Sequence, residues 1–290
     1  MTAIDRLSNY HVREQTEPLS IPLALAHDVF GDAIVVRTGA GFPLAIDLRA
    51  PDRGASVLLE PSYEPGLTAL LERLLLPGRF VVDLGASVGY LTVLAGRAVT
   101  PDGTVLAWEA NPAAFDLLRS NVRRNRLETV VRLIQAEPHD LTGTTAMRAG
   151  FGVALPVEAR RLDDELPPGA RIDVLLLDAG RFGRRALRGM RRVVHENPDA
   201  VYICTAVPRG AHDVVAELSS AFGATMTVHR VGTAGELTPR EAGAGVGRPG
   251  ERRTETLVFA GPARMAEFGE AGVVHRILPR SRVIRGSMDG

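Results

Sequence analysis

The alternation of apolar, strand-like segments with helix-like segments constrains the fold of this 290-residue chain more than any other feature of the sequence. Buried-type strands are predicted, in chain order, at RFVVDLG, TVLAWEAN, VVRLIQAE, IDVLLLDAG and DAVYICTAV. Helices are predicted between them, for example at AAFDLLRSNVRRNRL, residues 113–127. Strands and helices that alternate at this spacing favour a doubly wound parallel sheet with helices on its faces. We therefore expect an α/β fold with a Rossmann-like sheet.

The segments outside this alternation are expected to be elaborations of the sheet. Residues 1–60 combine short apolar runs with Gly, Pro and Asp and are predicted to form a small β-rich cap, which leaves residues 61–290 as the main domain. Residues 143–170 contain scattered Gly and Pro and are expected to be a poorly determined connection. Residues 232–253 are rich in glycine and are predicted to be a mobile loop, either a solvated insertion or a lid. TETLVFAG, residues 254–261, is then expected as a strand at the sheet edge.

The remaining predicted elements are short strands and two further helices. The cap should contain strands at AIVVR, PLAID and VLLEP, and GLTALLERLLLP at 66–77 should form a helix that ends at a Pro-Gly pair. FGRRALRGMRRVVHE at 182–196 is predicted to be one helix. Arginines crowd this segment, and they are interpreted as a solvated helix face rather than an anion site.

The charge balance gives no reason to expect nucleic acid or a membrane as a partner. The 34 basic and 34 acidic residues cancel and the pI is about 7.1, so a partner must be recognised by local features. No apolar run approaches the roughly 18 residues that span a bilayer, so we expect a cytoplasmic protein. The single cysteine, Cys204, excludes an internal disulfide, and no His, Asp or Glu cluster has metal-ligand spacing, so we expect no metal.

The stretch VVDLGASVGY at 81–90 carries the strongest functional signal and has two interpretations. GASVG at 85–89 is a G-x-S-x-G sequence, which in hydrolases places a nucleophilic serine, here Ser87, on a strand-to-helix turn. However, no HGGG-like oxyanion segment precedes it, and Asp83 at the end of the strand suits a cationic or hydroxyl-rich ligand better. The hydrolase interpretation is therefore the weaker one.

A nucleotide-type loop accounts for more of the same residues. In an open α/β sheet the ligand lies beyond the carboxyl ends of the strands, where Gly85 and Gly89 would let the backbone and the next helix approach closely. Glu109 ends the second strand, and a carboxylate there can accept two hydrogen bonds from ribose hydroxyls. The loop lacks the middle glycine that admits a pyrophosphate, and Asp83 would repel a pyrophosphate but attract an ammonium or sulfonium group. S-adenosylmethionine carries both cationic groups and no phosphate, so it fits this loop better than NAD.

Four segments resemble the FkbM-type family of S-adenosylmethionine-dependent methyltransferases, between residues 60 and 205. They are SYEPGL, FVVDLGASVGYLT, WEANPAAFDLLRSNVRRN with Asn121 and Asn125 at matching helix positions, and RRLDDEL followed by IDVLLLD and ALRGM. The resemblance implies a class I methyltransferase fold with S-adenosylmethionine as cofactor. The implied cofactor site consists of Glu64, Asp83, Gly85, Ala86, Ser87, Gly89, Tyr90, Glu109, Ala110, Asn111, Glu137 and Asp178, with Tyr63 beside Glu64.

The resemblance also implies which part of the cofactor each of these residues would bind. The backbone of residues 85–89 would cradle the methionine part of the cofactor, with Asp83 near its ammonium group and Glu64 closing that end. Glu109 would hold the ribose, and Glu137 could reach the adenine amino group.

The fourth segment departs from the family pattern where the acceptor should bind. Aligned without gaps, the family's K-x-D-x-E-G-x-E becomes Leu176, Asp178, Gly180, Arg181 and Gly183, so the lysine and both glutamates are absent. Asp178 is the first candidate for a general base, although it could instead cap the next helix.

His139 is the second candidate for the base, because its pKa suits neutral pH. From the resemblance we expect O-methylation of a hydroxyl on a sugar or a natural-product scaffold, such as a polyketide-type antibiotic. An N-methyltransferase of an amino sugar (an aminoglycoside) and a catalytically silent cofactor-binding protein remain alternatives. The expected partner is a small-molecule acceptor, without nucleic acid or membrane, and the sequence leaves the oligomeric state open.

Overall fold

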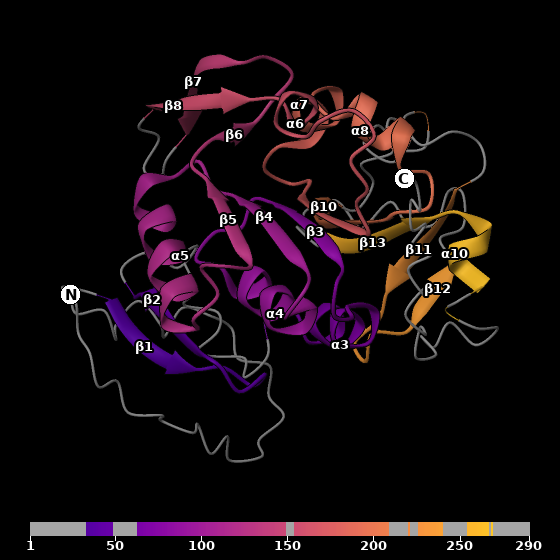
Figure 1. Ribbon diagram of the computed structural model, residues 1–290, viewed down its shortest axis with the longest axis horizontal. Helices are drawn as coiled ribbons and strands as arrows, with labels where there is room; N and C mark the ends of the chain where they lie inside the picture. Colours follow the sequence, from indigo (N-terminus) through magenta and orange to yellow (C-terminus); the bar gives the residue numbers. More distant parts are fainter. Residues whose placement is uncertain are drawn as a thin grey trace, which may run out of the picture.

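The computed structural model describes residues 33–48, 63–148, 154–208, 220, 226–239, 254–266 and 268. Its centre is an eight-stranded sheet of order β12-β11-β13-β10-β9-β3-β4-β5 (Figure 1). Five neighbouring strands are parallel, namely β5 (Val131–Ile134), β4 (Thr104–Trp108), β3 (Phe80–Leu84), β9 (Val174–Asp178) and β10 (Val201–Pro208). The predicted doubly wound sheet is therefore confirmed.

The other end of the sheet is antiparallel and differs from the prediction. β13 (Thr254–Ala260) pairs with β10 on one side and with β11 (Thr227–Val231) on the other, so the expectation of an edge strand at 254–261 is wrong. β11 and β12 (Leu237–Pro239) form an antiparallel pair outside β13, and β12 is the edge. Leu257, Val258 and Phe259 are all fully buried, as expected for a strand covered on both faces.

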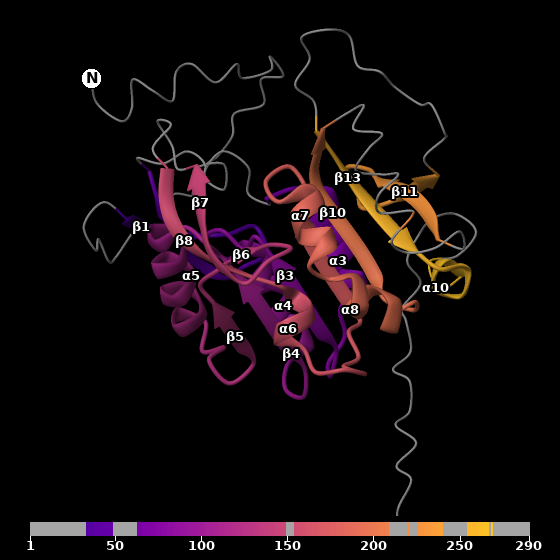
Figure 2. The same ribbon diagram turned by 90° about the horizontal axis from the view of Figure 1, so that it is seen from above.

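Helices cover both faces of the sheet, and the strand side chains alternate between them. One face carries α3 (Pro65–Leu74), α4 (Tyr90–Val99) and α5 (Pro112–Arg124), and the other carries α6 (Leu162–Glu165), α7 (Gly183–Arg188) and α8 (Arg191–Glu196). Figure 2 shows the second group in front of the sheet. Val81 and Ala107 belong to the hydrophobic cluster of the first face, whereas Val82 and Trp108 belong to that of the second. A last helix, α10 (Pro262–Ala266), follows β13.

The single helix predicted at 182–196 is instead two short helices, α7 and α8. The chain breaks at Gly189, which packs against the backbone of His139. A Cβ atom on Gly189 would lie 1.8 Å from the carbonyl oxygen of His139. This close approach requires glycine, and glycine weakens helix continuity.

The segment 143–170 is better ordered than the sequence suggests. β7 (Gly143–Arg148) and β8 (Ala154–Arg160) pair antiparallel, and the short β6 (Glu137–Pro138) pairs with β8 to complete a three-stranded sheet. The expectation of a poorly determined connection is therefore wrong for the described residues, 143–148 and 154–170.

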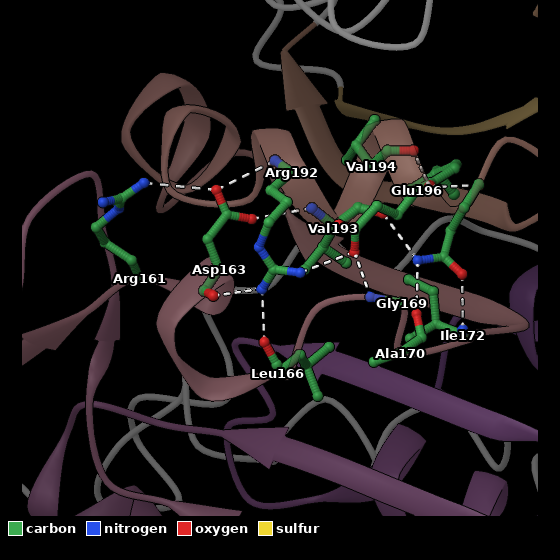
Figure 3. Close-up of polar contacts among 12 residues, drawn as sticks. Arg161, Asp163, Leu166, Gly169, Ala170, Ile172, Arg192, Val193, Val194 and Glu196 are labelled. Carbon is green, nitrogen blue, oxygen red and sulfur yellow. Dashed lines mark hydrogen bonds and ion pairs between the residues drawn. The ribbon is translucent and has the colours of Figure 1, made fainter.

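Polar side chains fix the connection after β8 onto α8 (Figure 3). The carboxylate of Asp163 accepts hydrogen bonds from the backbone N–H groups of Arg192 at 3.1 Å and Val193 at 3.0 Å, which caps the first turn of α8. The guanidinium of Arg192 donates to the carbonyl oxygens of Asp163 and Leu166 and pairs with Glu196 at 2.8 Å. These long-range contacts, rather than apolar periodicity, define the segment.

A two-stranded sheet made of β1 (Ala33–Arg37) and β2 (Pro43–Asp47) packs against α5. Asn121 is fully buried in α5, and its amide accepts from the N–H of Ala45 at 2.6 Å and donates to the carbonyl of Ala45 at 2.9 Å. The same amide donates to the carbonyl of Val88 at 2.8 Å, while Asn125 donates to that of Pro43 at 2.9 Å. The two asparagines thus tie the N-terminal strands to α5 and to the β3–α4 turn.

Two predicted features lie largely outside the described residues. The strand VLLEP at 57–61 is among the undescribed ones, as are residues 240–253 of the predicted loop. The described part of that loop, 232–239, forms a turn and β12.

Candidate functional site

The turn between β3 and α4, residues 85–89, lies at the carboxyl ends of the parallel strands. Gly85 and Gly89 have φ angles of +105° and +94°, and Ser87 adopts +53°. Only glycine adopts the first two without strain. A Cβ atom on Gly89 would lie 2.5 Å from the Cδ1 atom of Leu118, so the glycine also lets α5 pack against the turn.

Glu109, which directly follows β4, is fully buried and holds this turn. Its carboxylate accepts from the N–H of Ser87 at 3.0 Å and from that of Asn111 at 2.6 Å. The N–H of Ala86 donates to the carbonyl of Trp108 at 2.8 Å. The loop and the end of the neighbouring strand therefore form one hydrogen-bonded unit centred on a carboxylate.

The guanidinium of Arg181 covers the outer side of Glu109. Its Nη1 atom lies 3.3 Å from Oε2 of Glu109, and its Nη2 atom lies 3.3 Å from Oε1. The same Nη2 atom lies 2.9 Å from the Sδ atom of Met147, and the guanidinium carbon lies 5.2 Å from the ring centroid of Phe182. The Phe182 ring in turn approaches Gly85, where a Cβ atom would lie 2.7 Å from its Cε2 atom. The β9–α7 turn thus lies against the loop.

Asp83 lies near the end of β3 but is buried beneath the loop rather than open to it. The residue is 3% exposed, and one carboxylate oxygen accepts from the hydroxyl of Thr92 at 2.6 Å. The pKa of Asp83 is raised to about 6, mainly by burial and to a smaller extent by the charges of Glu109 and Asp178, against the opposing effect of the Thr92 hydrogen bond. The structure thus gathers three carboxylates at this end of the sheet.

Asp178 ends β9 and closes the turn that follows. Its carboxylate accepts from the N–H of Arg181 at 3.1 Å, and its carbonyl accepts from that of Phe182 at 3.0 Å. Because α7 begins only at Gly183, this aspartate stabilises the turn before the helix and not the first turn of the helix itself. Burial raises the pKa of Asp178, although its contacts with Arg181 oppose this rise.

Tyr63 and Glu64 directly precede α3, and Tyr63 contacts Tyr90 at the start of α4. The rings of Tyr63 and Tyr90 are 5.5 Å apart, and burial together with the Glu64 charge raises the pKa of Tyr63. Glu64 has a φ of +43° and accepts from the hydroxyl of Thr256 at 3.1 Å. A cavity of about 350 Å³ opens beside Glu64, between the start of α3 and strands β11 and β13. Its walls are formed by Glu64, Pro65, Gly66, Leu67, Arg230, Val231, Gly232, Thr233, Glu255 and Thr256.

The structure does not bring Glu137 and His139 to the loop. Both belong to the region of β6, with exposed fractions of 9% and 5%. The Nδ1 atom of His139 accepts from the N–H of Leu141 at 3.2 Å. Within the described residues, no hydrogen bond or ion pair joins either side chain to residues 85–89. Ala110 is buried beside Met147 instead of facing outward.

Sequence patterns missed the side chains that surround Glu109 and Asp83. Thr92 lies within the otherwise largely apolar helix α4, at a position that gives no functional signal in the sequence. Met147 and Phe182 look like ordinary apolar residues. Arg181 was conspicuous in the sequence because it replaces a glycine of the FkbM-type pattern. That replacement does not show that the arginine contacts Glu109.

Among the described residues, no group of three or more His, Cys, Asp or Glu side chains could hold a metal ion. No helix in the same part of the chain is long and apolar enough to cross a membrane.

Comparisons with known proteins agree on the class of the central domain. Residues 69–150 match the family model of the TRM5/TYW2 methyltransferase domain. A protein-L-isoaspartate O-methyltransferase of Aeropyrum pernix is 30% identical over 112 residues, which are 37% of this chain and 43% of the relative. The chain thus spans less than half the length of this relative. The fold is a Rossmann-like α/β sheet, and residues 69–150 are similar to a methyltransferase domain. Methyltransferases with this fold use S-adenosylmethionine as the methyl donor.

Two solved structures show a distant similarity to this chain. M. jannaschii TYW2 in complex with AdoMet is 14% identical with a TM-score of 0.45, over 80% of this chain and 87% of that one. The methyltransferase FkbM from Methylobacillus flagellatus is 16% identical with a TM-score of 0.44, over 63% and 43%. The matching family model is not that of FkbM-type enzymes, so the particular family expected from the sequence is not established.

Proposed function

We propose that this protein transfers the methyl group of S-adenosylmethionine to an acceptor bound beyond the carboxyl ends of β3 and β9. One observation carries the proposal: the buried carboxylate of Glu109 is hydrogen-bonded to the backbone of the glycine turn at Ser87. A ribose-binding acid and a cofactor loop must meet in this way, because the nucleoside bridges them. The match of residues 69–150 to a methyltransferase domain supports the same function.

The residues at the site suit the chemistry of this cofactor. Glu109 offers carboxylate oxygens for the ribose hydroxyls, and the turn at 85–89 offers backbone that no Cβ atom could occupy at Gly85 or Gly89 without a clash. Carboxylates near the turn favour a cationic ligand. Tyr63 and Glu64 would close the methionine end. Ala86, Tyr90, Ala110 and Asn111 would act through their backbone or by packing, and Glu137 keeps its proposed adenine contact by position alone.

Asp178 is the proposed general base, and His139 is no longer favoured. When bound, the cofactor supplies a methyl group on a sulfonium, which is transferred by in-line displacement. Asp178 ends a parallel strand at the ligand-facing edge, and its raised pKa improves its ability to take a proton from a hydroxyl. His139 is 5% exposed in a separate part of the fold, so an external acceptor cannot approach its imidazole without rearrangement.

The acceptor is proposed to be an oxygen or nitrogen nucleophile carried by a macromolecule. The TRM5/TYW2 match hints at tRNA, and the Aeropyrum relative is named for a protein acceptor. The sugar or natural-product hydroxyl expected from the sequence depends on the FkbM resemblance alone, whereas the expectation of no nucleic acid partner came from the balanced charge of the chain. An amine acceptor would need less help from a base, which fits the missing family glutamates.

Cofactor binding is tested first, by titrating S-adenosylmethionine, S-adenosylhomocysteine and NAD into the purified protein. The only tryptophan, Trp108, precedes Glu109, so its fluorescence offers a readout beside calorimetry. Glu109→Gln should lose binding, while Asp116→Asn on the exposed surface of α5 should not. Binding of NAD but not of the methyl donor would overturn the proposal. Methyl transfer from labelled cofactor to tRNA, to isoaspartyl peptides and to sugars then separates the acceptor classes.

A further inference from the structure

Both oxygens of the Glu109 carboxylate are already engaged by protein groups in this structure. Its two oxygens can accept about four hydrogen bonds. The backbone N–H groups of Ser87 and Asn111 take one position on each oxygen. The Nη1 atom of Arg181 donates a further hydrogen bond to Oε2 at 3.3 Å, and its Nη2 atom forms an ion pair with Oε1 at 3.3 Å. The two nitrogens therefore face the two carboxylate oxygens as a two-pronged fork, on the side away from the backbone.

Arg181 is held in this place by its other neighbours. Its Nη2 atom also contacts the sulfur of Met147, its planar group lies near the Phe182 ring, and its own N–H is bound by Asp178. Its side chain is nevertheless 32% exposed, whereas that of Glu109 is fully buried. The arginine can thus move toward solvent, but the glutamate cannot. Any rearrangement at this contact must come from Arg181.

We propose that Arg181 is a built-in competitor for the cofactor, which the ribose must displace from Glu109. The two backbone donors are fixed by the fold, so the positions that a pair of ribose hydroxyls could use are those that Arg181 now occupies. This inference rests on the proposed function, in which Glu109 binds the ribose. Arg181 therefore lowers cofactor affinity and selects for ligands with two adjacent hydroxyls that can replace both prongs of the fork.

The test compares the binding of S-adenosylhomocysteine by the wild-type chain, Arg181→Gln and Arg185→Gln. Arg185 is exposed on α7 and provides the matched loss of one positive charge. Partly exposed ion pairs contribute modestly, so Arg181→Gln should bind roughly three- to tenfold more tightly. Arg185→Gln should bind like the wild type. Arg181→Met, which keeps the length and apolar packing of the side chain, should repeat the gain and guards against a folding defect specific to glutamine.

The outcomes separate this inference from the proposed function. If the wild type binds and both Arg181 variants are folded but bind equally or more weakly, Arg181 does not compete and the inference is wrong. If Arg185→Gln gains as much as Arg181→Gln, the effect is one of general charge, and the inference is again wrong. If even the wild type fails to bind S-adenosylhomocysteine and S-adenosylmethionine, the methyltransferase proposal itself fails.

Discussion

Replacement of Asp83 by asparagine should stabilise the protein at neutral pH. Asp83 is 3% exposed, and burial is the main reason why its pKa rises from 3.8 to about 6. Each pH unit between the folded and unfolded pKa corresponds to about 1.4 kcal/mol. Keeping this carboxylate ionised in the folded protein therefore costs about 3 kcal/mol. Asparagine avoids this cost and still offers an oxygen to the Thr92 hydroxyl.

The sign of the pH dependence follows from the raised pKa. Between about pH 4 and pH 6 the folded protein keeps the proton of Asp83, whereas the unfolded chain has lost it. The free energy of unfolding of the wild type should fall as the pH rises through this range and then level off for this group. Asparagine resembles the protonated carboxyl, so the advantage of Asp83→Asn should grow from near zero at about pH 4 to about 3 kcal/mol at pH 7.

Urea denaturation of both proteins at pH 4, 5, 6 and 7 measures this difference directly, because other titrating groups are common to the two. Thr92→Val is the matched control: it removes the hydrogen bond that lowers the pKa of Asp83, so the fall in its stability should continue to a higher pH than in the wild type. A difference between Asp83→Asn and wild type that does not vary with pH would refute the reasoning. So would an asparagine variant that is less stable at pH 7.

Three further substitutions test other parts of the structure. Asp163→Ala should lower the unfolding free energy by about 1–2 kcal/mol in urea denaturation, because α8 loses its cap. Asn121→Ala should cost about 2–4 kcal/mol in the same assay, because it leaves buried backbone groups unpaired at the N-terminal strands and at the glycine turn. Gly89→Ala should lower thermal stability more than Gly78→Ala, which shares the positive φ but has open space around it, by about 1–3 kcal/mol for the contact with Leu118. Equal losses at the two glycines would show that crowding contributes nothing.

The parallel half of the sheet could be predicted because its strands are predominantly apolar runs that alternate with helices, a pattern set largely by burial on both faces. The antiparallel end could not be ordered in the same way. β13 pairs with β11, although residues 232–253 separate the two strands in the chain. No local sequence pattern determines the order of β10, β13, β11 and β12 in the sheet. The segment around β8 and α6 was missed for a related reason, since polar caps such as Asp163 join residues far apart in the chain.

The glycine turn and Glu109 could be found from the sequence because their backbone and charge requirements are local. The role of Arg181 could not be found in this way, because an arginine at a glycine position of the family pattern does not reveal its partner. In the structure that partner is Glu109. Asp83, Glu109 and Asp178 place three carboxylates at one end of the sheet, and the pKa values of Asp83 and Asp178 are raised partly by their neighbours.

In this structure Arg181 is the cation that lies on the most buried of the three carboxylates. A ligand that displaces Arg181 from Glu109 must therefore replace its charge as well as its hydrogen bonds. The ribose hydroxyls alone supply only the hydrogen bonds. S-adenosylmethionine also brings an ammonium and a sulfonium group, whereas the pyrophosphate of NAD would add negative charge to an end of the sheet that already holds three acids. The arginine that competes with the cofactor is thus also a reason why the site should prefer a cationic one.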